Sequence, residues 1–284
     1  MIRLSAATVL LQWSVGGLMF LWVTTRRREV GIGYGWLLRS VYLVMAVGAV
    51  AAGRMVRPSM VRDVSAGSVA AAAGAALVVS ILRRKAGIAG QRDLSARRRA
   101  RVAAMTGIDR PVAAVDPSVR EFPPVVDLVA PLIGVVGLVA AGIADGGPHP
   151  LAVVRTLIGA VFLGAVTDAM LLGHWYLVQP GLGRAPLNEL VRWVIYVWPF
   201  EVAALLWPTG MVQVLNGHIH DGYGGLLAWF WVACVVTTLG LCVVTVLALR
   251  ERYYSAVMAA TGLLYLAILT AFGTDLVARA ILAK

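Results

Sequence analysis

Residues 223–249 read YGGLLAWFWVACVVTTLGLCVVTVLAL, and this stretch contains no charged side chain. A helix crosses a bilayer with about 20 mostly apolar residues, so the stretch is long enough to span a membrane. Comparable stretches recur along the chain. We expect spans at approximately 5–24, 34–53, 65–82, 124–144, 151–178, 190–215, 223–249 and 256–281. The sequence therefore predicts an all-α polytopic membrane protein, in which residues 1–284 form one bundle of about eight transmembrane helices.

The overall composition agrees with a membrane class. Hydrophobic residues make up 60% of the chain and charged residues 14%, and the mean hydropathy is +0.83. A soluble domain is about 45–50% apolar and about 25% charged, so a soluble enzyme, a secreted disulfide scaffold and a disordered regulator fit poorly. Cys234 and Cys242 lie about 12 Å apart along one helix, too far for a disulfide. We interpret them as small buried hydrophobes.

The net charge of +11 predicts an orientation. Most of the basic residues belong to four loops on one side of the predicted bundle, at 25–33, 83–123, 179–189 and 250–255. The other side receives only Arg3, Arg54, Arg57, Arg62 and Lys284. By the positive-inside rule the first side is cytoplasmic and both termini lie outside. Nearly all basic residues are Arg in an Ala-, Val- and Gly-rich chain, which indicates a GC-rich bacterial genome and hence a bacterial inner membrane.

The longest loop, 83–123, is strongly basic. It contains RRK at 83–85 and LSARRRARVAAM at 94–105. We expect a short basic amphipathic helix that lies on anionic lipid. Aromatic residues do not alternate with these arginines, so a nucleic-acid partner is not expected.

Short signatures of familiar membrane enzymes do not occur. The sequence contains no H-E-x-x-H, no D-D-x-x-D, no G-x-S-x-G, no P-loop and no C-x-x-C. These motifs carry metal, diphosphate, nucleophile, phosphate and thiol chemistry. A stand-alone enzyme of a familiar type is therefore not expected.

Two acids within the predicted spans are the first functional candidates, because an ionisable group is costly in a bilayer. Asp168 and Glu201 lie on either side of the GLGRAP turn at 181–186. Counting from residue 183, their depths differ by only about 4–5 Å. They would share a proton if both face the bundle interior, or each would bond separately to hydroxyls, backbone or water. Pro199 and Pro208 flank Glu201 and predict either a proton, ion or ligand site between two helix breaks or a helix that is merely bent.

A second candidate group lies near the predicted cytoplasmic interface. His174 is followed by Trp175 and Tyr176 in GHWYLVQP, and Arg192 lies at the same predicted depth. An apolar pocket with a few placed donors suits a quinone. His174 is therefore a candidate proton group, quinone donor or haem ligand, and the alternative is an interfacial histidine bonded to a neighbouring helix.

The predicted outer loops contain His149, His218, His220 and Asp221. Three histidines and a carboxylate suit zinc or copper, provided that the two loops meet. The alternative is a set of solvated loop histidines.

Two ion pairs are expected within the helices. Asp275 and Arg279 are four residues apart, the acid first, which is a favourable spacing on a helix. Asp127 and Arg39 both lie near predicted cytoplasmic ends, where they would either pair or extend to the interface.

Two strings in the last 120 residues carry a resemblance. LLGHWYLVQPGL at 171–182 and YSAVMAATGLLYLA at 254–267 resemble segments of multi-span bacterial membrane proteins without an assigned function, associated with respiratory gene neighbourhoods. In length and span number the chain is also similar to the menaquinol-binding anchor subunits of the DMSO-reductase type. That likeness has no motif behind it, so no residue role carries over.

Three functions follow as hypotheses. The first is a subunit of a bacterial respiratory-type complex that handles protons or quinone beside other membrane subunits. The second is a proton-coupled transporter or channel for a small solute, in which the same acids couple to protons. The third is a structural or assembly protein without a site of its own.

Overall fold

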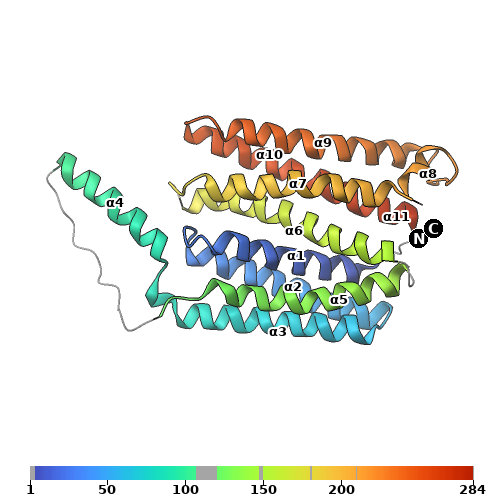
Figure 1. Cartoon of the computed structure of the whole chain (residues 1–284), viewed down its shortest axis with the longest axis horizontal. Helices are drawn as coiled ribbons and strands as arrows, with labels where there is room; N and C mark the ends of the chain where they lie inside the picture. The colour runs from blue at the N-terminus through green and yellow to red at the C-terminus, as the bar shows by residue number, and fades with distance from the viewer. Residues whose placement is uncertain (1–3, 107–119, 147–149, 180, 209, 284) are drawn as a thin grey trace.

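The computed structural model describes residues 4–106, 120–146, 150–179, 181–208 and 210–283 (Figure 1). Within these ranges the secondary structure is helical, without a strand. The α-helices are α1 (Ala6–Thr25), α2 (Ile32–Val56), α3 (Met60–Leu82), α4 (Ala89–Thr106), α5 (Val129–Gly146), α6 (Pro150–Val178), α7 (Ala185–Leu206), α8 (Met211–Leu215), α9 (Leu226–Ala248), α10 (Tyr254–Phe272) and α11 (Ala278–Leu282). The shorter elements are η1 (Arg84–Ala86), η2 (Pro124–Leu128) and a π-helical segment, η3 (Gly273–Val277).

The predicted all-helical membrane bundle is confirmed. In the described part of the chain, seven helical stretches are long and apolar enough to cross a membrane. They are Ala6–Thr25, Ile32–Val56, Met60–Leu82, Pro124–Gly146, Pro150–Val178, Leu226–Ala248 and Tyr254–Leu282. Cys234 and Cys242 are buried and free within α9.

The remaining long helix, α7, packs against α6 and α9 but carries three charged residues, Glu189, Arg192 and Glu201. It also differs from the predicted span 190–215. The helix begins at Ala185 and ends at Leu206, and Met211–Leu215 forms the separate α8. Trp207 precedes Pro208 and is extended, because the proline ring disfavours helical geometry in the residue before it.

The two ends of the bundle differ in charge. Both chain termini lie at one end, and α4 extends from the other (Figure 1). We call these the terminal end and the basic end; the basic end also contains Arg26–Arg28. The predicted basic loop 83–123 contains α4, and residues 107–119 lie outside the described ranges. Its arginines occupy positions 92, 97, 98, 99 and 101, which are spread around the helix at 100° per residue, so they do not form one basic face of the predicted amphipathic helix.

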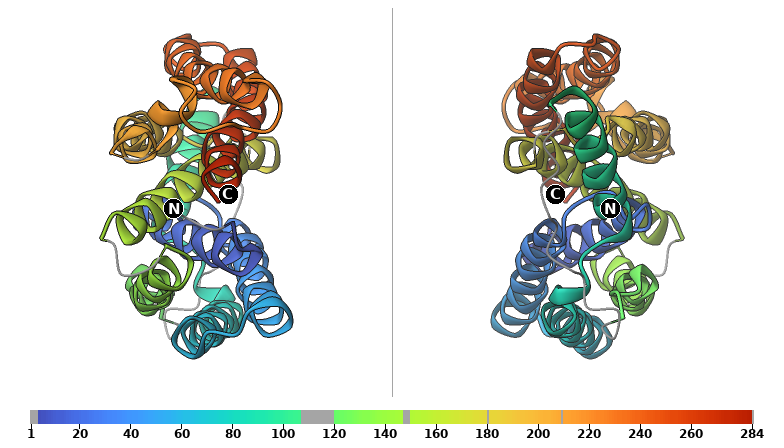
Figure 2. Two further views of the ribbon diagram at one scale, coloured as in Figure 1. Left: turned by 90° about the vertical axis from the view of Figure 1, so that its right-hand side faces the viewer. Right: turned by 90° about the vertical axis from the view of Figure 1, so that its left-hand side faces the viewer.

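The centre of the bundle is the contact between α1 and α6. Viewed end-on, α1, α2, α3 and α5 form one half and α7, α9 and α10 the other (Figure 2). A Cβ atom added at Gly16 would overlap the backbone of Ala160, and one added at Gly164 would overlap the backbone of Gly16. The two helices therefore touch backbone to backbone, as small residues permit in membrane proteins.

We expect Gly16→Ala to destabilise the fold by about 1–3 kcal/mol, the usual cost of overpacking. Gly240→Ala in α9 is the matched control, since nothing lies within 4 Å of a Cβ there. Alanine should be neutral or stabilising at that position by about 0.5–1 kcal/mol, because it is the better helix former. Thermal unfolding in detergent measures both changes, and equal effects at the two positions would contradict the backbone contact.

Candidate functional site

A cluster of charged and polar side chains lies inside the bundle toward the terminal end. Its members are fully buried and come from four parts of the chain. They are Gln12 of α1, Arg155 of α6, Glu201 of α7, and Asp275 and Arg279 of the last span. Burying charge is costly unless partners compensate, so the contacts within this cluster decide what it can do.

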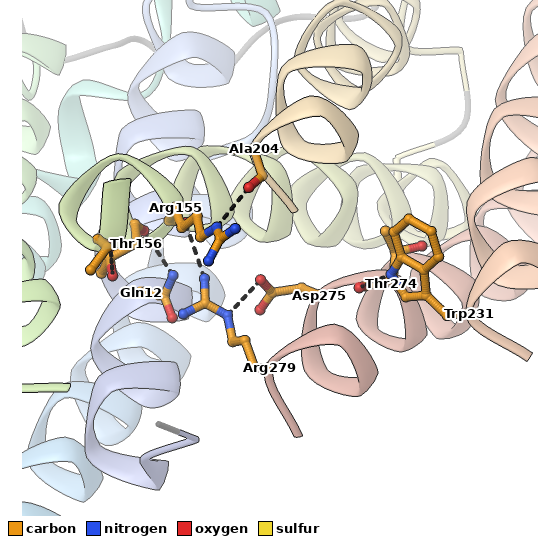
Figure 3. A network of polar contacts seen from close by, with 9 residues as sticks. Gln12, Arg155, Thr156, Ala204, Trp231, Thr274, Asp275 and Arg279 are labelled. Carbon is orange, nitrogen blue, oxygen red and sulfur yellow. Dashed lines mark hydrogen bonds and ion pairs between the residues drawn. The ribbon is translucent and has the colours of Figure 1, made fainter. Parts of the chain in front are cut away.

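Arg279 connects the last span to α6. Its Nε donates to Asp275 Oδ1 at 2.7 Å, and its Nη2 donates to the carbonyl oxygen of Arg155 at 3.0 Å (Figure 3). Arg155 Nε in turn donates to the carbonyl oxygen of Ala204 at 2.6 Å. Gln12 Nε2 donates to the carbonyl oxygen of Thr156 at 2.7 Å. The pair Asp275–Arg279 thus lies within a network that crosses the bundle.

A glycine makes room for this network. A Cβ atom at Gly159 of α6 would lie 2.7 Å from Arg279 Nη2, 2.9 Å from Gln12 Nε2 and 3.1 Å from Asp275 Oδ1. These three side chains therefore meet over the bare backbone of Gly159. Small residues here serve the polar contacts as well as helix packing.

Several buried polar atoms of the cluster have no hydrogen-bond partner. They are Gln12 Oε1, Arg155 Nη2, Asp275 Oδ2 and both carboxyl oxygens of Glu201. Glu201 interacts electrostatically with Asp275, Arg279 and Arg155. Two ionised carboxylates are acceptors only, so they cannot bond to each other, but a single proton lets one donate to the other. A proton on either acid would let Glu201 and Asp275 form such a bond.

Helix irregularities flank the pair. Asp275 belongs to the π-helical segment η3, and Pro199 lies inside α7, two residues before Glu201. A π segment is frequent at functional sites, and proline removes one backbone hydrogen bond from its helix. Both carboxyl groups thus stand where the helices depart from regular geometry.

Asp168 does not bond to Glu201 but follows the second alternative, a separate bond to a hydroxyl group. The hydroxyl of Tyr42 donates to Asp168 Oδ1, and Tyr34 Oη lies 3.4 Å from its backbone oxygen. Counted from Val178 and Ala185, the depths of the two acids differ by about 9 Å. Asp168 also lies about 140° around α6 from Arg155, so it faces α2, whereas Arg155 faces α7.

The predicted group near residue 174 is dispersed. His174 is exposed, with Nδ1 3.1 Å from Tyr265 Oη, and Arg192 is exposed on α7. Trp175 Nε1 donates to Gln179 Oε1 at 3.1 Å, and Tyr176 donates to the carbonyl oxygen of Gly183 at 2.5 Å. Within the described residues no hydrogen bond joins these side chains to Asp168 or Glu201. Tyr176 and Trp175 instead anchor the turn after α6.

Asp221, the acid of the predicted outer metal site, binds backbone N–H groups. Both carboxylate oxygens of Asp221 accept backbone N–H groups at the start of α9, from Tyr223 and Gly225 at 2.9 Å and from Leu227 at 2.9 Å. In the described ranges no three His, Cys, Asp or Glu side chains gather to hold a metal. His218 and His220 belong to this loop, and His149 lies outside the described residues.

A second buried ion pair lies toward the basic end. Arg39 of α2 makes two bonds to Asp127 of η2, at 2.7 and 2.8 Å, and its guanidinium lies 4.4 Å from the ring centre of Phe122. Bidentate geometry and an aromatic neighbour both suit arginine.

At the terminal end Arg62 pairs with Asp63, which offsets the positive charge of the 54–62 segment.

Sequence reasoning missed three members of these sites. Arg155 is the one Arg or Lys of the predicted span 151–178. A charged side chain is costly in a bilayer, so its position within the span could have marked it as a candidate site residue. Gln12 and Tyr42 are neutral residues that helices often carry, and nothing local distinguishes them. Their roles depend on which helices are neighbours.

Comparison with known protein families, with curated proteins and with solved structures finds no match to this chain.

We expect Arg279→Met to lower the free energy of unfolding by about 3–5 kcal/mol, because it leaves Asp275 buried without its cation. Adding Asp275→Leu to that variant should recover part of the loss. Arg192→Met, at an exposed arginine, is the control and should change little. Denaturation in detergent measures all three, and an equal loss for both arginines would contradict the network.

The Asp221 contact predicts a pH dependence. The N–H groups of Gly225 and Tyr223 hold the pKa of Asp221 below its ordinary value. Its stabilisation of the α9 start is therefore present above the unfolded pKa of about 3.9 and is lost as pH falls through the lower folded pKa. The melting temperatures of wild type and Asp221→Ala should differ at neutral pH and converge in acid. A difference in melting temperature that persists in acid would argue against this capping role. The same difference in the control variant His220→Ala would also argue against it.

Proposed function

We propose that this integral membrane protein takes up and releases protons at the Glu201–Asp275 pair. One observation carries the proposal: neither oxygen of Glu201 and only one oxygen of Asp275 has a hydrogen-bond donor, although both residues are fully buried. One shared proton would pair two of these three oxygens, since the protonated acid donates to the other. In the proton transfer, the O–H bond of that acid breaks and the proton moves to an acceptor outside the pair.

Arg155 and Arg279 balance the charge of this step. With the proton bound, the two arginines face one negative charge; after its release they face two. Arg279 bonds to Asp275 throughout, while Arg155 Nη2 has no partner and is the free donor for the second carboxylate. The cations thus stabilise the ionised pair in a low-dielectric site.

The proposed setting is a bacterial inner membrane, with the basic end in the cytoplasm and both termini outside. The arginines at the basic end support this orientation, and α4 is the proposed contact for anionic lipid. Within that setting we place the protein beside other membrane subunits of a respiratory-type complex, on the resemblance of residues 171–182 and 254–267. Protons rather than quinone are the proposed cargo, because His174 and Arg192 do not converge.

A proton-coupled transporter is the second candidate. Pro199 and the π segment around Asp275 support it, because interrupted helices next to a buried acid are common at transporter binding sites. Proteoliposomes that contain the purified protein distinguish the two functions. A transporter moves protons together with an added solute, whereas a complex subunit moves protons only when its partner subunits are present.

Infrared spectroscopy tests the shared proton directly. We expect the purified wild type to show the C=O band of a protonated carboxyl group, and Glu201→Gln to lose it while remaining folded. Glu189→Gln is the control, since Glu189 pairs with Arg26 and Arg27 at the basic end. If neither Glu201→Gln nor Asp275→Asn removes a carboxyl band that the wild type shows, the proposal is overturned.

A further inference from the structure

A pocket opens at the terminal end, among the start of α1 and the ends of α2 and α5. Its volume is about 390 Å³, which is room for several water molecules. The described residues that line it include Ser5, Gly53, Arg57 and Asp145, and Asp145 is the acid among them. Water in this pocket therefore meets a single carboxyl group.

Asp145 connects the pocket to the bundle interior. It is only 6% exposed, and the hydroxyl of Thr8 donates to its Oδ2. The charged groups that act on it are Arg57 beyond α2, Arg62 of α3 and Arg279 of α11. Arg279 is also the cation of the Glu201–Asp275 pair, so the two acidic sites share one neighbour.

The face of α1 continues this connection inward. Gln12 lies one turn after Thr8 and on the same face. It is fully buried, and its Oε1 is an acceptor without a donor. Its Nε2 lies beside Arg279 and Asp275 over Gly159. A water molecule bonded to Gln12 Oε1 would be held by a residue that lies one turn from Thr8 and also reaches the carboxyl pair.

The opposite direction is less accessible. Asp168, the nearest acid on α6 toward the basic end, lies about 20 Å from Arg155 along the helix. Between them Gly16 and Gly164 bring the backbones of α1 and α6 into contact, so no side chain of these two residues bridges that distance. The terminal end thus offers the shorter route.

We infer that Asp145 passes protons between this pocket and the Glu201–Asp275 pair, a role that rests on the proposed function. In the inward step, a hydronium ion in the pocket water transfers its proton to the Asp145 carboxylate and leaves a water molecule. The O–H bond of Asp145 then breaks, and the proton reaches the pair through water held by Thr8 and Gln12. Asp145 returns to its ionised form, ready for the next proton. With the termini outside, the pair exchanges protons with the outer face.

Hydrogen–deuterium exchange of the carboxyl band tests this route. After the detergent-solubilised protein is mixed with D2O, infrared spectroscopy follows the shift of the protonated carboxyl band of the pair. We expect Asp145→Asn to slow this exchange by at least roughly tenfold, because a positioned acid–base group is lost. Asp145→Glu should restore the rate, and Glu189→Gln at the basic end should leave it unchanged.

A second variant avoids dependence on the buried acid. Ser5→Trp fills the pocket from its half-buried rim and should slow the exchange in the same way. If the band is present but exchanges equally fast in Asp145→Asn and Ser5→Trp, the route is wrong while the shared proton stands. If wild type shows no such band, the proposed function itself fails.

Discussion

The backbone contact between α1 and α6 is the constraint on which the interior depends. Gly16 and Gly164 allow the two helices to touch, and Gly17 next to them leaves the space that the ring of Tyr42 fills. Two polar regions lie on either side of this contact. Toward the terminal end Gln12 meets the charge cluster, and toward the basic end Tyr42 meets Asp168. The packing of small residues therefore separates the two buried acidic regions.

The cost of burying charge explains how each polar region is composed. Arg39 and Asp127 satisfy each other in a bidentate pair, and Arg279 satisfies one oxygen of Asp275. Pairing offsets part of the desolvation penalty of each ion, whereas a buried charge without its partner bears the whole penalty. Glu201 lacks a dedicated donor, so it depends on its neighbours' protonation and charge. Asp168 also keeps one oxygen without a donor, but Glu201 differs from the other buried acids of the described residues because neither of its oxygens has one.

Residue spacing in the sequence predicted a contact within one helix but did not predict which side chains meet between helices. The spacing of Asp275 and Arg279 places them on one face of a single helix, and they are bonded there. Asp168 and Glu201 belong to different helices. Their depths were estimated from the number of residues alone, without the rotation of each helix about its axis. A depth estimate also depends on where a hairpin turns, and Pro208 ended the predicted span 190–215 early by forcing Trp207 out of helical geometry.

The sequence by itself determined the helical spans, the basic end and the identity of most buried acids. These features follow from hydropathy, loop charge and the cost of an ionisable group in lipid, all of which are properties of single segments. Only the tertiary structure decided that Glu201 meets Asp275, that Tyr42 bonds to Asp168, and that Asp145 joins a pocket to Thr8. The reason is physical: a partner across a helix interface is chosen by rotation and close packing of whole helices, and no local pattern encodes either.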